Sequence, residues 1–172
     1  MSWRAVEDAI AQAIRLAAGL SESQVVWDYH DGPRPSDSPF LSMHIASDVL
    51  VGMQPEVTRE YDSVRGRIIA THSSNRELTV RVTCYTKGQN AEYSARSVLA
   101  ELQNAIGFET VRDVLEFANV SLVDRGSISA VPLVLDSSWE NRAVLELRFR
   151  LRDFAQEALG YIASAVIEGE VQ

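Results

Sequence analysis

The chain has 172 residues, of which 46% are hydrophobic and 23% are charged, as expected for one globular domain with its own core. Its 24 acidic and 16 basic residues give a net charge of −8, which argues against a large basic patch that binds nucleic acid. No apolar run approaches the roughly 20 residues that cross a bilayer. The N-terminal segment lacks the uninterrupted apolar stretch of a signal peptide, so we expect no membrane segment and a cytoplasmic product.

The first predicted element is an amphipathic helix from Trp3 to Ala18, with Ser2 as its N-cap and Gly19 as its C-terminal stop. Its apolar face carries Val6, Ile10, Ala13, Ile14 and Ala17. A short strand, Val25–Trp27, follows. The segment from Asp28 to Pro39 contains three prolines and a glycine, which predicts an irregular loop.

The middle of the chain predicts strands around a polar stretch. The first strand runs from Phe40 to Val51, and Gly52–Gly66 then shows little period, which indicates a loop or a long hairpin arm. Two further strands, Ile68–Thr71 and Glu77–Tyr85, are joined by a predicted turn at His72–Asn75. The side chains expected to point inward from the second of these strands are Leu78, Val80, Val82 and Cys84.

The second half of the chain begins with a predicted helix from Ala91 to Ile106, ended by Gly107, and a shorter helical segment from Glu109 to Phe117. Four strands are predicted after it: Val120–Ser127, Ser129–Leu135, Glu140–Leu151 and Tyr161–Val171. The third has the clearest pattern, because apolar and charged residues alternate strictly from Leu145 to Arg152. Such alternation predicts a strand with one buried face and one solvated, charged face.

These elements together predict a single α+β domain over residues 1–172. We expect a mostly antiparallel sheet flanked by two main α-helices, with a long loop or hairpin arm in the middle of the chain.

Little in the sequence points to catalysis. Cys84 is the only cysteine and lies on an inward strand face, so we interpret it as a buried structural thiol. The three histidines lie far apart, and Asp28, His30 and Asp31 alone make a weak metal-binding pattern. The sequence has no nucleophile elbow, phosphate-binding loop, dinucleotide-binding turn or metalloprotease helix motif. We therefore expect no enzyme activity, no cofactor and no metal.

Several segments, in this order, resemble the neck or tail terminator proteins, also called tail-completion proteins, of long-tailed phages and prophages. After an N-terminal helix come VVWDYHDGPRPSDSPFLSMHI from Val25, ELTVRVTCYTKG from Glu77 with the helix behind it, and SWENRAVLELRFRL from Ser138. The most similar features are the following: Trp27 with its proline-rich loop, Pro39-Phe40, Tyr85 at the end of its strand, and Trp139-Glu140 with Arg142-Ala143. The resemblance covers nearly the whole chain.

This resemblance implies a virion structural protein that forms a ring, typically a hexamer, at the head-proximal end of the tail. Such a ring caps the tail tube, stops its polymerisation and docks it to the head–tail connector or head-closure protein. Genome DNA passes through without specific binding, and a net acidic ring would disfavour its sticking. Assembly would take place in the bacterial host cytoplasm, and the finished protein would lie in the neck of the virion.

A ring of identical subunits needs interfaces in which one patch meets a different patch on the neighbour. Trp27 and Trp139 stand at strand edges, where packing is the ordinary interpretation and a subunit-interface anchor the alternative. The arm carries interleaved charges of both signs, as a contact that fixes register would. The candidate interface residues are Trp27, Arg59, Tyr61, Arg65, Trp139 and Arg142.

Other functions remain open from the sequence. The nearest alternative is another phage head-closure or minor tail protein of related fold. A small-ligand-binding domain that uses the Asp28–Pro39 loop belongs to a different class, as does a hydrolase whose catalytic residues are scattered along the chain. Ring assembly would separate the first two functions from the others.

Overall fold

The computed structural model describes residues 2–29, 35–86, 94–131, 133–135 and 138–159. Three α-helices and one short 3-10 helix accompany seven strands in this part of the chain. The helices are α1 (Trp3–Ala18), η1 (Glu22–Gln24), α2 (Ala95–Ala105) and α3 (Glu109–Phe117). The strands are β1 (Val25–Trp27), β2 (Phe40–Asp62), β3 (Arg67–Thr86), β4 (Val120–Asp124), β5 (Ile128–Ala130), β6 (Leu133–Leu135) and β7 (Ser138–Leu159).

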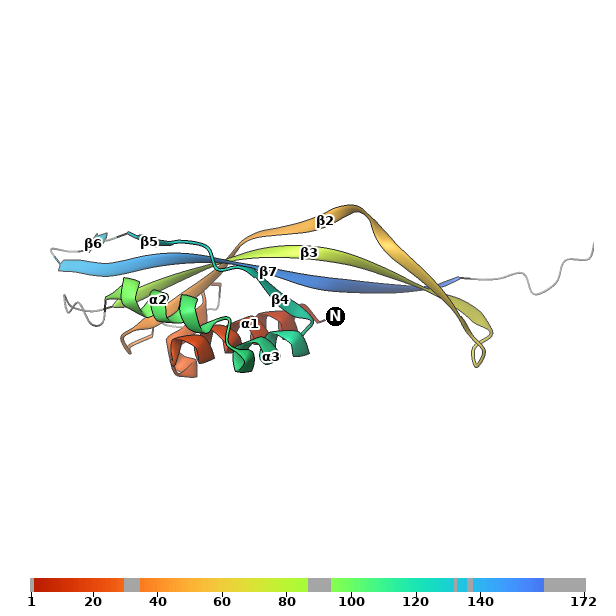
Figure 1. Cartoon of the computed structure of the whole chain (residues 1–172), viewed down its shortest axis with the longest axis horizontal. Helices are drawn as coiled ribbons and strands as arrows, with labels where there is room; N and C mark the ends of the chain where they lie inside the picture. Colours follow the sequence, from red (N-terminus) through yellow and green to blue (C-terminus); the bar gives the residue numbers. More distant parts are fainter. Residues whose placement is uncertain (1, 30–34, 87–93, 132, 136–137, 160–172) are drawn as a thin grey trace, which may run out of the picture.

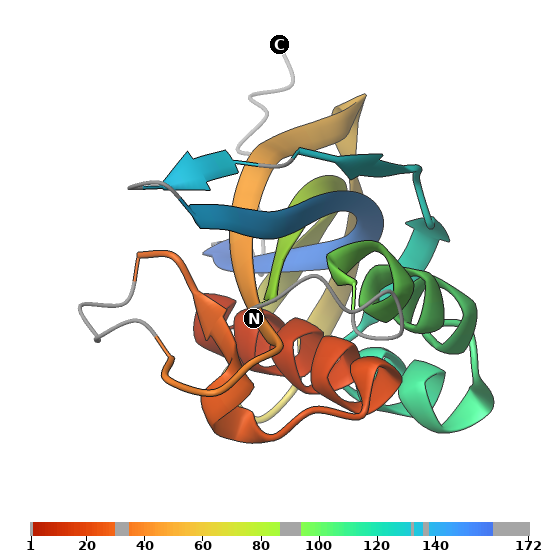
Figure 2. The ribbon, with the colours of Figure 1, turned by 90° about the vertical axis from the view of Figure 1, so that its left-hand side faces the viewer.

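The sheet has the strand order β1-β2-β3-β7-β4, and β5 and β6 also pair with β7. Only β1 and β2 run parallel, whereas all the other described pairs are antiparallel. The three α-helices gather below one end of the sheet, and its other face is open (Figures 1 and 2). The predicted α+β class with a mostly antiparallel sheet is therefore confirmed.

Helix α1 has the predicted bounds because both ends carry local signals. Gly19 adopts a left-handed φ of 64°, and its amide N–H and that of Leu20 donate to carbonyl groups of the last helical turn. Ser2 holds the N-cap position without a side-chain capping bond. The whole predicted apolar face is buried, and it packs on the sheet and on the other two helices.

Helix α2 begins at Ala95, and Ser94 caps it by accepting a 3.1 Å hydrogen bond from the amide of Ser97. We predicted a start at Ala91, but a cap at Ser94 places the first helical turn after it; residues 91–93 lie outside the described part. Helix α3 covers all of the predicted segment and buries Val111 and Leu115, so it is a third helix of the layer.

Three strands are longer than predicted. β2 continues through the polar stretch to Asp62, and β7 continues to Leu159. The predicted turn at His72–Asn75 is wrong, because β3 passes straight through these residues. His72 pairs with Val57 on one side and Ala155 on the other. Two neighbouring strands therefore satisfy the backbone N–H and C=O groups of a polar segment whose sequence alone resembles a turn.

Two other predicted strands are shorter in the structure. Val120–Ser127 ends at Asp124, and Ser129–Leu135 is divided into β5 and β6. Gly126 has a φ of 55°, which turns the chain between β4 and β5. The predicted terminal strand Tyr161–Val171 lies outside the described residues.

The core lies between the helices and one face of β2, β3 and β7. The four inward residues predicted for β3 are fully buried, and so are Leu145, Leu147 and Phe149 of β7. The charged residues that alternate with them lie on the open face of the sheet, where Arg81 and Glu146 form an ion pair of 2.8 Å. The predicted division of this strand into a buried face and a charged face is confirmed.

Beyond the helices, β2, β3 and β7 project together as one three-stranded extension (Figure 1). We call it the arm and define it as the β2–β3 hairpin from Glu56 to Ser74 together with Asp153–Leu159 of β7. Only Ala70 and Ser73 are buried within it. The polar stretch is thus half of a hairpin arm, and a third strand from the far end of the chain supports that hairpin.

Candidate functional site on the three-stranded arm

The arm leaves both of its outer strand edges open. β1 pairs with β2 only as far as Met43, and β4 pairs with β7 only from Arg148 to Leu151. Within the described residues, no strand lies beyond β2 from His44 to Asp62, or beyond β7 from Arg152 to Leu159. Edge strands of this kind present unpaired backbone N–H and C=O groups, which are a template for pairing with another chain.

Large apolar side chains are exposed along the arm and its root. Leu50 of β2 is 57% exposed and Tyr61 is 56% exposed. Others exposed on the same extension are Val49, Val51, Val57, Val64 and Phe154. Apolar side chains that lie together on a projecting surface indicate a place where another molecule docks. Exposed apolar residues without such a role are usually scattered singly over the surface.

Polar contacts connect the three strands of the arm to one another. His72 Nε2 lies 2.9 Å from Glu157 Oε1, which links β3 to β7 on the face that continues from the helix-covered side. On the other face, Gln156 Nε2 donates to Thr71 Oγ1 at 3.1 Å. These contacts order an extension that buries little apolar surface of its own.

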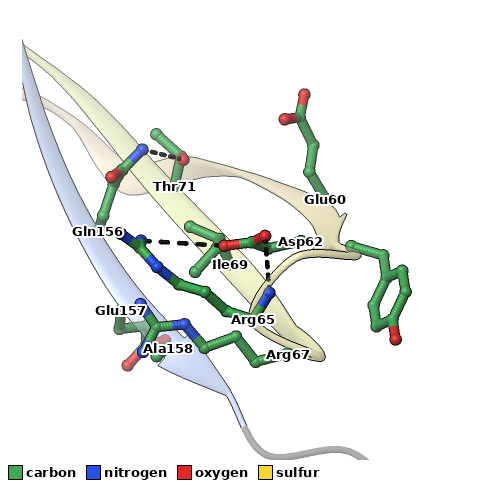
Figure 3. A pocket seen from close by; sticks show the side chains of 10 residues that line it. Glu60, Asp62, Arg65, Arg67, Ile69, Thr71, Gln156, Glu157 and Ala158 are labelled. Carbon is green, nitrogen blue, oxygen red and sulfur yellow. Dashed lines mark hydrogen bonds and ion pairs between the residues drawn. The ribbon is translucent and has the colours of Figure 1, made fainter.

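The tip of the arm forms an open hollow (Figure 3). Asp62 accepts hydrogen bonds of 3.1 Å from the amides of Val64 and Arg65, which shapes the turn between β2 and β3. The Arg65 guanidinium lies 3.9 Å from the same carboxylate, and Arg67 Nε is buried without a hydrogen-bond partner. The hollow therefore mixes cationic and anionic groups, as suits a protein partner.

The predicted interface residues fall into two groups. Arg59, Tyr61 and Arg65 lie together on the outer part of the arm and are exposed. The other three lie in the body of the domain: Trp27 in β1, and Trp139 and Arg142 near the start of β7.

Trp27 and Arg142 have packing roles within the subunit. Trp27 is 6% exposed, and its ring stacks on Tyr29 with a centroid distance of 5.6 Å. The Arg142 guanidinium lies 5.8 Å from the centre of the Tyr85 ring, which itself stacks on Phe40. Trp139 pairs through its backbone with Val134. The arm therefore offers the more accessible contact surface.

Sequence reasoning missed Leu50, Val57 and Phe154 as surface candidates. Leu50 lies at the end of the predicted strand Phe40–Val51, Val57 stands in the stretch without clear period, and Phe154 follows the end of the alternating pattern in β7. The length of the strands was the available signal. Strand residues that extend past the ends of the helices cannot be covered by those helices, so they stay exposed.

The ionisable groups of the body give little sign of catalysis. Burial raises the pKa of the Cys84 thiol to about 12, which leaves it protonated and a poor nucleophile at neutral pH. Burial and the neighbouring Glu7 carboxylate raise the pKa of Tyr29. His44 Nδ1 contacts Asp28 Oδ2 at 2.8 Å. His30 and Asp31, named with Asp28 as a weak metal pattern, lie outside the described residues.

Two kinds of feature are absent from the described part of the chain. No three side chains among its histidines, cysteine and acidic residues gather in a way that could hold a metal ion. None of its helices combines the length and apolar character needed to cross a membrane.

Comparisons with known proteins agree with this architecture. The model of a family described as phage neck terminator protein matches residues 4–171. A comparison with curated proteins gives no match. Among solved structures, the fold is similar to the sheath/tube terminator of an extracellular contractile injection system, PVC, in its extended state. That match has a TM-score of 0.53 and 12% sequence identity, and it covers 99% of this chain and 65% of the longer one.

Proposed function

Because this chain belongs to the phage neck terminator protein family, we propose that it closes the head-proximal end of a phage tail as a ring of identical subunits. Its role is that of a structural tail terminator protein of the virion. The family match over nearly the whole chain is the observation that carries this proposal. The ring, which we expect to be a hexamer, caps the tail tube and docks it to the head-closure protein, and it carries out no reaction.

The arm is our proposed contact between neighbouring subunits. It projects beyond the helices, has two strand edges that no described strand covers, and exposes Val57, Tyr61 and Phe154. A ring interface joins different patches on its two sides, and a projecting arm that reaches the body or the arm of a neighbour meets this requirement. The net charge of −8 supports passage of DNA without specific binding, and we place assembly in the host cytoplasm.

The solution mass of the protein across a concentration series, with negative-stain images of the largest species, tests the ring. We expect closed rings of about six subunits, since closed point-group symmetry is the rule for soluble homo-oligomers. A protein that stays monomeric is next mixed with purified tail tubes, where we expect it at one end only. Absence of both rings and end binding would overturn the proposal, and binding to connectors rather than tube ends would favour a head-closure role.

An armless variant tests the contact surface. Val51 and Asn75 are paired across the β2–β3 ladder, so an Asn-Gly turn can replace residues 52–74 between them, and the chain can end after Arg152. We expect this variant to be folded by circular dichroism, monomeric by solution mass and unable to form the ring. A milder test compares Tyr61→Ser with Phe108→Ser, because Phe108 at the N-cap of α3 is similarly exposed. Rings should weaken in the first variant and persist in the second.

A further inference from the structure

The open edges of β2 and β7 differ in their apolar content. On β2 the exposed large apolar side chains are Val49, Leu50, Val51, Val57 and Tyr61. On the described part of the β7 edge the corresponding side chain is Phe154. The β2 edge is also the longer one, since no described strand covers it from His44 to Asp62. An additional strand would therefore bury more apolar surface by pairing with β2 than by pairing with β7.

The sequence supplies a candidate strand next to the arm. Residues 160–172, GYIASAVIEGEVQ, follow directly after β7, whose last residue Leu159 pairs with Ile68 in the arm. Their pattern predicts a strand with Tyr161, Ala163, Ala165 and Ile167 on one face. The segment has two acidic and no basic residues, whereas Arg59 and Arg65 are exposed on the arm.

The arm of the same subunit is a poor partner for this strand. Only Gly160 separates Leu159 from the predicted strand, and hairpin connections normally need two or more residues. The β2 edge of the same subunit lies across β3 from the end of β7. A second copy of the chain imposes neither restriction, because its β2 edge can approach the segment from any direction.

We propose that residues 160–172 of one subunit pair as a strand with the β2 edge of a neighbouring subunit's arm. The backbone ladder would supply the affinity, and the apolar side chains beside Val57 and Tyr61 would fix the register. Donor segment and acceptor edge are different patches, so the contact can repeat from subunit to subunit, and it forms a ring when the rotation between neighbours closes. The inference deepens the proposed ring and rests on it.

Ending the chain after Leu159 tests the donor strand. We expect the shortened protein to stay folded and to associate at least about tenfold more weakly than the full chain, because several cross-strand pairs are lost together. Unchanged rings from the shortened protein would overturn the inference and leave the proposed function standing. A full-length protein that neither forms rings nor binds tube ends would instead overturn the proposed function.

Disulfide cross-linking between mixed variants tests which edge accepts the strand. One copy carries Val57→Cys, and the other carries a cysteine at residue 163, 165 or 167, which share a face of the predicted strand. The matched control is Ala155→Cys, because His72 pairs with both Val57 and Ala155, and all three share one face of the arm. The native Cys84 is fully buried and can remain.

We expect a cross-linked dimer from the Val57→Cys mixture and not from the Ala155→Cys mixture. A cross-link from the C-terminal cysteine to Ala155→Cys, or the lack of a cross-link in both mixtures, would overturn the pairing. The assay can also be used if the purified protein is monomeric, because the two variants can be mixed at high concentration or in the presence of tail tubes.

Proline substitutions give an independent test of the edge. Successive amides of an antiparallel edge strand alternate between the ladder and the open side. One of Thr58→Pro and Arg59→Pro therefore removes a bond to β3, and the other removes only an outward N–H. The variant that keeps its thermal midpoint should lose ring assembly. Normal rings from that variant would contradict the pairing.

Discussion

The Arg152 guanidinium on β7 donates a hydrogen bond of 2.5 Å to the Glu56 carboxylate on β2, across the strand that separates them. The same group donates to Ser73 Oγ on that middle strand at 3.0 Å. One side chain therefore connects all three strands where the arm leaves the body, although Arg152 and Glu56 lie 96 positions apart in the sequence.

Glu56→Gln should loosen the arm while leaving the body unchanged. Exposed ion pairs contribute about 0.2–1 kcal/mol, so we expect the free energy of unfolding to fall by less than about 1 kcal/mol. Hydrogen exchange should become faster in the arm segments of β2 and β3, because few buried contacts hold them otherwise. Exchange measured by mass spectrometry checks this, with Glu146→Gln in the body as control. Faster exchange in Leu78–Cys84 after Glu56→Gln would contradict the prediction.

Asp124→Asn should destabilise the protein at pH 7 and have little effect in acid. The Arg148 side chain, which donates to Asp124 at 2.9 Å, lowers the pKa of this carboxyl below its usual 3.8, and the Gly126 amide adds to the effect. A lowered folded-state pKa gives stability that is present above the unfolded-state pKa and is lost as pH falls through the folded-state value.

Urea unfolding at pH 7 and near pH 3 measures this difference. The gap between wild type and Asp124→Asn should narrow in acid, and Asp113→Asn on the exposed face of α3 serves as the control. A gap of equal size at both pH values would show that the carboxylate charge is not the cause.

Cys84 should resist thiol reagents in the folded protein. The side chain is fully buried, and burial raises its pKa from 9.0 to about 12. A raised folded-state pKa means that the neutral thiol contributes stability below about pH 9, and this contribution is lost as pH rises toward 12. Labelling with a chromogenic disulfide at pH 8 should proceed only in denaturant. Rapid labelling of native protein would indicate opening of the sheet core.

Gly126→Ala should cost far more stability than Gly66→Ala. Both glycines have left-handed φ values, which cost other residues about 1–2 kcal/mol. A Cβ at Gly126 would also lie 2.0 Å from the Glu146 carbonyl oxygen, whereas a Cβ at Gly66 would meet open space. We expect a loss of about 1–2 kcal/mol for Gly66→Ala and at least about 1–3 kcal/mol more for Gly126→Ala. Equal losses in chemical denaturation would contradict the prediction.

Local signals predicted the elements whose causes are local. Helix α1 has its bounds because Gly19 adopts the left-handed conformation, and the inward face of β7 follows from strict alternation after Leu145. The turn predicted at His72–Asn75 failed because those residues become a strand only through their partners on β2 and β7. Composition cannot reveal a partner that lies more than eighty positions away.

The candidate site also has parts that local sequence predicts and parts that depend on distant packing. The sequence indicated a polar arm and named Arg59, Tyr61 and Arg65 on it, but it left open whether the arm was a loop or a hairpin. The exposure of Leu50 and Phe154 depends on where the helix layer ends, which is a property of the packed domain. The burial of Trp27 has the same origin, since α1 and β2 enclose β1.

The strands of the arm are also the central strands of the body. β3 and β7 keep an unbroken register from Thr86 and Asn141 in the core to Ile68 and Leu159 near the tip. A force applied at the tip is therefore carried along continuous backbone into the part of the sheet beneath the helices, with no loop to absorb it. Such an extension acts as a stiff lever, so strain at a contact between neighbouring subunits would be transmitted to the core of each domain.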